Sequence, residues 1–196
     1  MANPIAKVKN PALLSRFEHL AAEAAILIDK SYTDGKTLAR GVLMGKQVTG
    51  GKYRPYVEAE VKTGGNFATN STAGTLDLST QVGPVAFQAG DVIETVAGTA
   101  IGTISTINAS TGAIVLTGNA SNAVSAGTKV RIATSQLALD AGKGKILKDE
   151  VQIDGLDQPA VGYFEGFFIQ ANTTVTDAAL TAMSGKTIDS GEIRLV

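Results

Sequence analysis

Short apolar runs alternate with glycine-containing turns along most of the chain. Between residues 91 and 132 these runs are rich in Val, Ile and Thr, the β-branched residues that favour strands. Four or five strands that recur about every ten residues predict a small antiparallel barrel or sandwich. The predicted strands of this region cover residues 91–96, 100–107, 113–117 and 128–132.

A second group of apolar runs lies on either side of this region. Before it, two predicted strands flank a turn at Thr49-Gly50-Gly51, and Pro55 is expected at a strand end or a sheet edge. After it, the run at 160–169 holds four of the ten aromatic residues, so we expect it to be the core strand of the main domain. The other predicted elements are strands at 41–45, 52–56, 145–148, 151–153 and 192–196, and a short helix at 178–183 capped by Thr176.

The N-terminal part has a helical periodicity instead. Asn10 suits a helix N-cap and Pro11 suits the first helical position, and apolar residues then recur at three and four positions. This pattern predicts an amphipathic helix over 11–24, although the run at 25–28 also fits the start of a strand. Next along the chain, Asp34-Gly35 is a turn signal that predicts a hairpin. The small polar residues at 62–75 predict a flexible connector.

The amino-acid composition excludes several kinds of catalytic and metal-binding site. The chain has no Cys and no Trp, and its only His is His19, which falls off the apolar stripe of the predicted helix and is expected at the surface. This removes disulfide frameworks, thiolate metal sites, Cys nucleophiles and nearly all His-based triads. We therefore expect no enzymatic activity, no metal site and no cofactor.

Charge is distributed unevenly although the net charge is −1. Residues 1–56 hold nine Lys and Arg against four Asp and Glu, whereas residues 134–196 hold five against nine. The basic residues are dispersed and have no interleaved aromatic ladder, so the pattern favours ordinary surface or an acidic partner over nucleic acid. No apolar run is long enough to span a bilayer, and the N-terminal residues lack the order of a secretory signal, so we expect the protein to be made in a cytoplasm and to avoid membranes.

Two motifs need a choice between chemistry and structure. Gly35-Lys36-Thr37 matches the end of a phosphate-binding loop, but Lys30 occupies the position of its first glycine, so nucleotide binding is not supported. Carboxylates occur in close pairs that a glycosidase or an acid–base catalyst could use. The simpler interpretation places Glu58 and Glu60 on the exposed face of a strand and Asp154 and Asp157 around a turn, where a loosely bound calcium is the alternative. Asp149 and Glu150 form the third pair.

Several of these segments resemble the head decoration, or cement, proteins of tailed bacteriophages. Leu-Ala-Arg-Gly-Val-Leu-Met-Gly-Lys at 38–46 and Gly-Lys-Tyr-Arg-Pro-Tyr at 51–56 are similar to a hairpin of that family. Ile-Leu-Lys-Asp-Glu-Val at 146–151, Asp-Gln-Pro-Ala-Val-Gly-Tyr at 157–163 and Glu-Gly-Phe at 165–167 are similar to a later stretch, and Ala-Ala-Leu-Thr at 178–181 also fits. The resemblance covers roughly residues 34–56 and 140–183.

The resemblance implies a mainly β protein with three parts. Residues 34–56 plus 136–196 would form a small β-barrel or β-tulip-like decoration domain, residues 57–135 an inserted antiparallel β domain, and residues 1–33 a capsid-facing arm and short helix. The protein would bind the major capsid protein on the exterior of the virion as a homotrimer, and it would stabilise the mature head against the pressure of the DNA. The implied capsid contacts are Lys7, Lys9, Arg16 and Phe17, and the implied core or oligomer strand carries Tyr163, Phe164, Phe167 and Phe168.

Two other classes of protein fit the same sequence. A tail, fibre or baseplate module would share the β-rich, cysteine-free composition. A carbohydrate-binding or hydrolytic module would depend on Tyr163, Phe164 and the Asp154 loop.

Overall fold

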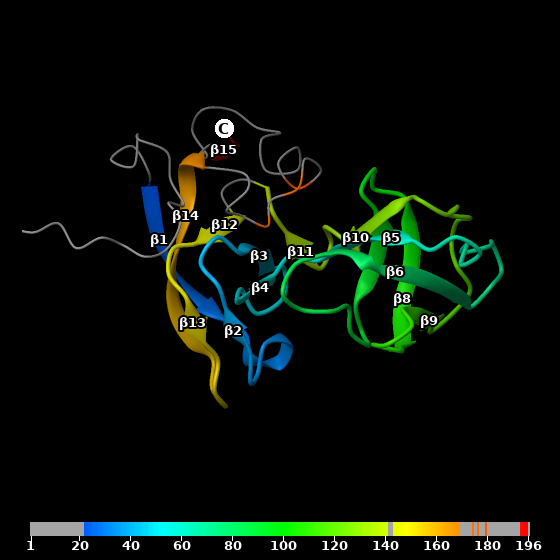
Figure 1. Cartoon of the computed structure of the whole chain (residues 1–196), viewed down its shortest axis with the longest axis horizontal. Helices are drawn as coiled ribbons and strands as arrows, with labels where there is room; N and C mark the ends of the chain where they lie inside the picture. Colours follow the sequence, from blue (N-terminus) through cyan, green and yellow to red (C-terminus); the bar gives the residue numbers. More distant parts are fainter. Residues whose placement is uncertain are drawn as a thin grey trace, which may run out of the picture.

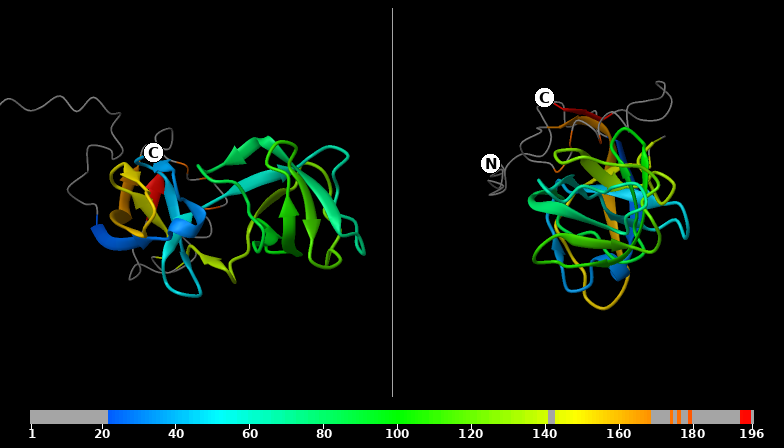
Figure 2. Two further views of the ribbon diagram at one scale, coloured as in Figure 1. Left: turned by 90° about the horizontal axis from the view of Figure 1, so that it is seen from below. Right: turned by 90° about the vertical axis from the view of Figure 1, so that its right-hand side faces the viewer.

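The protein is mainly β and its strands form two large units (Figure 1). The computed structural model describes residues 22–140, 143–168, 174, 176, 179 and 193–195. The chain leaves the first unit after β4, forms all six strands of the second unit, and returns to the first unit at β11. The two units lie side by side along the long axis, as the view from below also shows (Figure 2). We call the first unit the body and the second the barrel.

The body is built on a seven-stranded sheet with the order β1-β4-β3-β12-β14-β15, in which β11 adds to β3. β1 pairs with both β4 and β14, so five of these strands close into a ring. A separate two-stranded ribbon of β2 and β13 completes the body. The strands are β1 (Ala22–Ile28), β2 (Thr37–Leu38), β3 (Leu43–Gln47), β4 (Tyr53–Pro55), β11 (Leu137–Ala138), β12 (Lys145–Leu147), β13 (Val151–Gln152), β14 (Gln158–Phe168) and β15 (Ile193–Leu195).

The barrel is closed, with the strand order β10-β5-β6-β9-β8-β7. Because β10 and β7 pair, the barrel has no free edge strand. An exposed edge strand could pair with another chain and cause aggregation. Alternation is clear in β9, where Ile114 and Leu116 face the core and Ala113 and Val115 face outward. The strands are β5 (Glu58–Val61), β6 (Ala73–Val82), β7 (Val92–Thr95), β8 (Ala100–Ile107), β9 (Ala113–Leu116) and β10 (Lys129–Ile132).

Two hydrophobic cores stabilise the fold. One lies within the body and includes Ile28, Met44 and Leu147. The other fills the barrel and continues without a break onto the opposite face of the body, where Ile146 and Tyr163 join it. The two units therefore share buried apolar surface, which is the dominant stabilising contribution in domains of this size.

Most of the predicted strands are confirmed. All four strands predicted between residues 91 and 132 form, as do the strands on either side of the Thr49-Gly50-Gly51 turn. Pro55 is the last residue of β4, so it lies at a strand end as expected. Ala179 is the only described residue of the predicted 178–183 helix, and its backbone N–H donates to the Thr176 hydroxyl oxygen at 3.1 Å, as expected of a capping threonine.

The predicted N-terminal helix is wrong at its C-terminal end, because Ala22–Ile28 is strand β1, and the strand alternative at 25–28 is the correct one. Its earlier residues lie outside the described part of the chain. The hairpin predicted at Asp34-Gly35 is also wrong. Asp29 instead caps a short 3-10 helix, η2 (Lys30–Tyr32), and the segment after it pairs with β13 rather than with β1. The Asp34 carboxylate accepts a hydrogen bond from Gly155 N at 2.8 Å, which holds the turn against a distant loop.

The flexible connector predicted at 62–75 is the third correction. Phe67 within it is 1% exposed in the barrel core and forms an isolated bridge with Val124. Gly74 allows this packing, because a Cβ atom at that position would lie 2.3 Å from the Phe67 ring. The strand that follows, β6, is the longest in the barrel and was not among the predicted strands. A buried aromatic ring and backbone hydrogen bonds, such as those from Lys62 N to Thr75 O at 2.9 Å and from Thr75 N to Gly65 O at 2.9 Å, thus order a segment whose composition is typical of a linker.

Candidate functional site

The junction between body and barrel is the most elaborate polar site among the described residues. Two short links cross it: residues 56–57 between β4 and β5, and residues 133–136 between β10 and β11. Because β5 and β10 are antiparallel neighbours, the two links run side by side. Tyr56, Val57 and Ala133 are all buried. The first link is therefore part of the core, whereas the second link is buried at Ala133 and exposed at Thr134 and Ser135.

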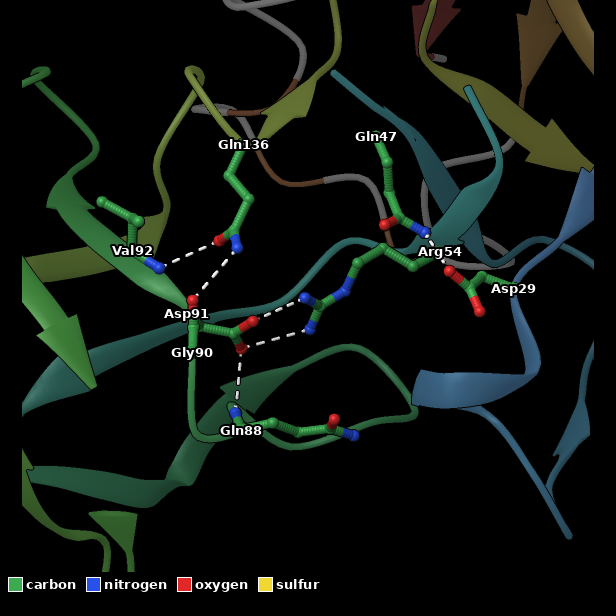
Figure 3. Close-up of polar contacts among 8 residues, drawn as sticks. All are labelled: Asp29, Gln47, Arg54, Gln88, Gly90, Asp91, Val92 and Gln136. Carbon is green, nitrogen blue, oxygen red and sulfur yellow. Dashed lines mark hydrogen bonds and ion pairs between the residues drawn. The ribbon is translucent and has the colours of Figure 1, made fainter. Parts of the chain in front are cut away.

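Arg54 of the body and Asp91 of the barrel form a buried ion pair at this junction (Figure 3). The two guanidinium nitrogens Nη1 and Nη2 donate to the two carboxylate oxygens at 2.6 and 3.2 Å, and both side chains are 1% exposed. Each partner is also held by its own unit. The Arg54 guanidinium lies 3.6 Å from the centre of the Tyr32 ring in η2, and Asp91 accepts a hydrogen bond from Gln88 N at 2.8 Å.

Gln136 holds the same part of the barrel from the second link (Figure 3). Its side-chain oxygen accepts from Val92 N at 2.9 Å and its side-chain nitrogen donates to Gly90 O at 3.1 Å. The backbone N–H of Ala133 donates to Val92 O at 2.7 Å. The second link therefore contacts Gly90 and Val92, the residues on either side of Asp91, while Arg54 of the body contacts Asp91 itself.

A second buried cluster surrounds Glu58. Its carboxylate accepts from the Tyr56 hydroxyl at 2.8 Å and from the Thr176 hydroxyl at 2.9 Å, and Lys129 Nζ lies 3.6 Å away. Burial and the neighbouring Glu58 carboxylate raise the pKa of Tyr56, so its hydroxyl stays protonated and keeps donating. Arg131 is a neighbouring cation, paired with Glu94 at 3.0 Å.

This cluster corrects one sequence prediction. Glu58 was expected on an exposed strand face with Glu60, but it is 2% exposed, whereas Glu60 is half-buried. Alternation along β5 does place both outside the barrel interior, since Ala59 and Val61 point inward. The outer face of β5 at Glu58 is covered by the body, and local sequence gives no sign of that contact.

A third polar group fastens η2 to the loop after β13. Asp157 accepts from Lys30 N at 3.0 Å and pairs with Lys52 Nζ at 2.7 Å. Gly155 has a φ of +71°, consistent with the turn predicted between Asp154 and Asp157. Burial of Asp29 acts to raise the pKa of its carboxyl group. Hydrogen bonds from Gln47 and Ser31 outweigh this effect and hold the pKa below its ordinary value; Gln47 lies beside Asp29 in Figure 3. These carboxylates are engaged as structural acceptors.

Two backbone donors of the Gly35-Lys36-Thr37 motif are engaged within the body. Gly35 N donates to Ile153 O at 3.0 Å and Lys36 N donates to Thr33 O at 2.9 Å. Within the described residues, no group of three or more His, Asp or Glu side chains is placed to hold a metal ion. In the same part of the chain, no helix is long and apolar enough to cross a membrane.

The site residues implied by the resemblance divide into two groups. Lys7, Lys9, Arg16 and Phe17 lie outside the described residues, as does His19. Tyr163 is 4% exposed and belongs to the shared core, with Lys148 Nζ 5.8 Å from its ring centre. Its ring is therefore not open for stacking against a sugar. The backbone positions of Phe164, Phe167 and Phe168 lie in β14.

Sequence reasoning missed the junction residues Arg54, Asp91, Glu94 and Arg131. The only available signal was a charge within or beside an apolar strand run, as at Glu94 and Arg131. Such a charge is expected to be paired if the strand is buried, but the sequence does not name its partner.

Comparisons with known proteins do not add a relationship: no family model, no curated protein and no solved structure matches this chain.

Proposed function

We propose that this chain is a structural decoration protein of a virus particle, which binds the outer surface of a mature tailed-phage head and stabilises it. The observation that carries the proposal is the spatial relation of the two sequence segments that resemble the decoration family. They are separated by about eighty residues in sequence. In the body, β12 of the later segment pairs with β3 of the earlier one, through Lys145 with Met44 and Ile146 with Leu43.

The same sheet joins the remaining pieces of the resemblance. β12 also pairs with β14, where Ile146 lies opposite Tyr163, and β4 pairs with β3 across the Thr49-Gly50-Gly51 turn. The resembling segments are thus contiguous in space although they are not contiguous in sequence. This is the arrangement expected if a decoration domain carries an inserted β domain between two of its strands.

The described surface favours a binding protein over a glycan receptor. The exposed large apolar residues are aliphatic, and no Phe or Tyr is among them in the described part of the chain. Sugar platforms depend on exposed aromatic rings, so this surface supports protein contact better than carbohydrate contact. The outer face of β1 and β14 contributes Leu27 and Val161, which are 43% and 37% exposed, to such a surface.

Stabilisation by decoration follows from binding linkage. A protein that binds only the mature lattice lowers the free energy of that lattice by RT ln(1 + [L]/Kd). This amounts to about 2.7 kcal/mol per site when the free concentration of the protein is 100 times Kd. A homotrimer that engages three sites gains further through effective concentration, without new contacts. In this proposal the body binds the major capsid protein and the barrel projects from it.

The test is cryo-electron microscopy of particles from the phage that encodes the chain, alongside heads produced without it. We expect density for the body and barrel on the capsid exterior, and heads without the chain should release DNA at a lower temperature. Density confined to the tail, fibre or baseplate would replace the proposal with that alternative. Equal heat resistance of the two kinds of head would refute the stabilising role.

A further inference from the structure

We propose that the barrel is locked in one orientation on the body by a buried latch formed by Arg54, Asp91 and Gln136, so that the two units move as a single rigid piece. This inference concerns the chain alone and does not depend on the proposed function. It starts from the two short links, which by themselves would act as a double hinge. Whether they bend is decided by the contacts that surround them.

Arg54 is immobilised from both directions. On the body side it follows Tyr53 in β4 and packs against the Tyr32 ring, and on the barrel side two of its nitrogens meet both oxygens of Asp91. A bidentate pair of this kind is satisfied in one relative orientation, because the guanidinium and the carboxylate must be nearly coplanar. Rotation of the barrel would break both bonds and leave two charges without solvent.

Asp91 is fixed within the barrel. Its backbone O accepts from Ile104 N at 2.8 Å and its backbone N–H donates to Gln88 O at 3.1 Å, so the carboxylate cannot follow Arg54 if the units separate. Gln136 adds a second contact point by bonding the residues before and after Asp91. These two contact points, together with two adjacent links that run in opposite directions, hold the barrel against rotation.

The latch is an orientation device more than a source of stability. Desolvation of a buried ion pair offsets much of its attraction, so a well-packed apolar replacement often preserves stability. Apolar contacts are not directional, whereas the bidentate pair is. The chemistry therefore predicts that stability and orientation can be separated by mutation.

Double electron–electron resonance on the full chain tests the latch directly. The chain has no native Cys, so Thr37→Cys in the body and Ala113→Cys in the barrel give two unique labelling sites on exposed strand positions. We expect one narrow distance distribution in the otherwise native chain. The double variant Arg54→Met with Asp91→Leu should keep its thermal midpoint within a few degrees but broaden the distribution at least twofold.

Lys52→Ala is the matched control, since it removes a partly exposed ion pair that lies wholly within the body. Its distance distribution should equal that of the native chain. If the double variant fails to fold, Gln136→Ala provides the second test, because that side chain bridges only the link and residues 90–92, and it too should broaden the distribution. A broad distribution in the native chain, or an unchanged narrow one in the latch variant that folds, would overturn the inference.

Discussion

Lys145 provides the sharpest test of the energetics of the body. It lies in β12, opposite Met44 of β3, and is 6% exposed. Burial, with a smaller effect from the neighbouring charge of Lys46, lowers the pKa of Lys145 from 10.5 to about 8. A difference of about 2.5 pKa units at about 1.36 kcal/mol each corresponds to a cost of roughly 3 kcal/mol for carrying the charged form into the folded state.

The sign of the pH dependence follows from this shift. The folded-state pKa lies below the unfolded one, so the penalty is fully present below pH 8 and disappears as pH rises toward 10.5. Lys145→Met removes the charge at similar length. The free energy of unfolding of the variant minus that of the native chain should be about 2 to 3 kcal/mol larger at pH 7 than near pH 10.5, because only that change depends on the titration of Lys145.

Urea unfolding of both proteins at pH 7, 8, 9 and 10 measures this difference. Other groups that titrate at high pH cancel in the comparison, because both proteins contain them. A stability difference that does not change between pH 7 and 10 would refute the reasoning. That result would mean that the amine keeps its ordinary pKa in the folded protein despite its burial.

Three further predictions address packing and surface charge. Phe67→Ala should lower the free energy of unfolding by about 3–5 kcal/mol in chemical denaturation, because it empties a fully buried ring position in the barrel. Gly83→Ala should lower the thermal midpoint markedly, since Gly83 has a φ of +108° and a Cβ there would lie 2.2 Å from Tyr56 O; a normal midpoint would contradict the close backbone packing. Lys52→Ala should lower the free energy of unfolding by no more than about 1 kcal/mol in urea denaturation, because its ion pair with Asp157 is partly exposed to solvent, and a larger loss would contradict this reasoning.

Several of the buried charges in the described part of the chain lie at or near the junction between body and barrel. Arg54, Asp91, Glu94, Arg131 and Glu58 are all buried, and each has an ion-pair or hydrogen-bond partner. Removing one partner of such a pair costs about 3–5 kcal/mol because a charge is left without solvent. The Arg54–Asp91 pair, which joins the two units, therefore makes their misorientation unfavourable even where it adds little net stability, whereas Glu94 and Arg131 pair within the barrel.

The sequence by itself determined the fold class, mainly β, and the positions of most of the strands. Alternation of Val, Ile and Thr with polar residues, and turns marked by glycine, depend on local backbone geometry, so the strands between residues 91 and 132 are readable without tertiary information. The same local reasoning was insufficient at Ala22–Ile28, where a helical spacing of apolar residues runs into a strand that pairs with β14.

Only the tertiary structure decided which strands share a sheet and which charges are buried. The pairing of β12 with β3 joins residues about a hundred positions apart, and no periodicity encodes a partner at that separation. Phe67 shows the same limit in a small polar segment, and Glu58 shows it on a strand face that local alternation leaves outside the barrel. Burial of Glu58 is set by the body packing against the barrel, and burial of Phe67 by segments of the barrel that are distant in sequence, so both are properties of the folded chain and not of any window along it.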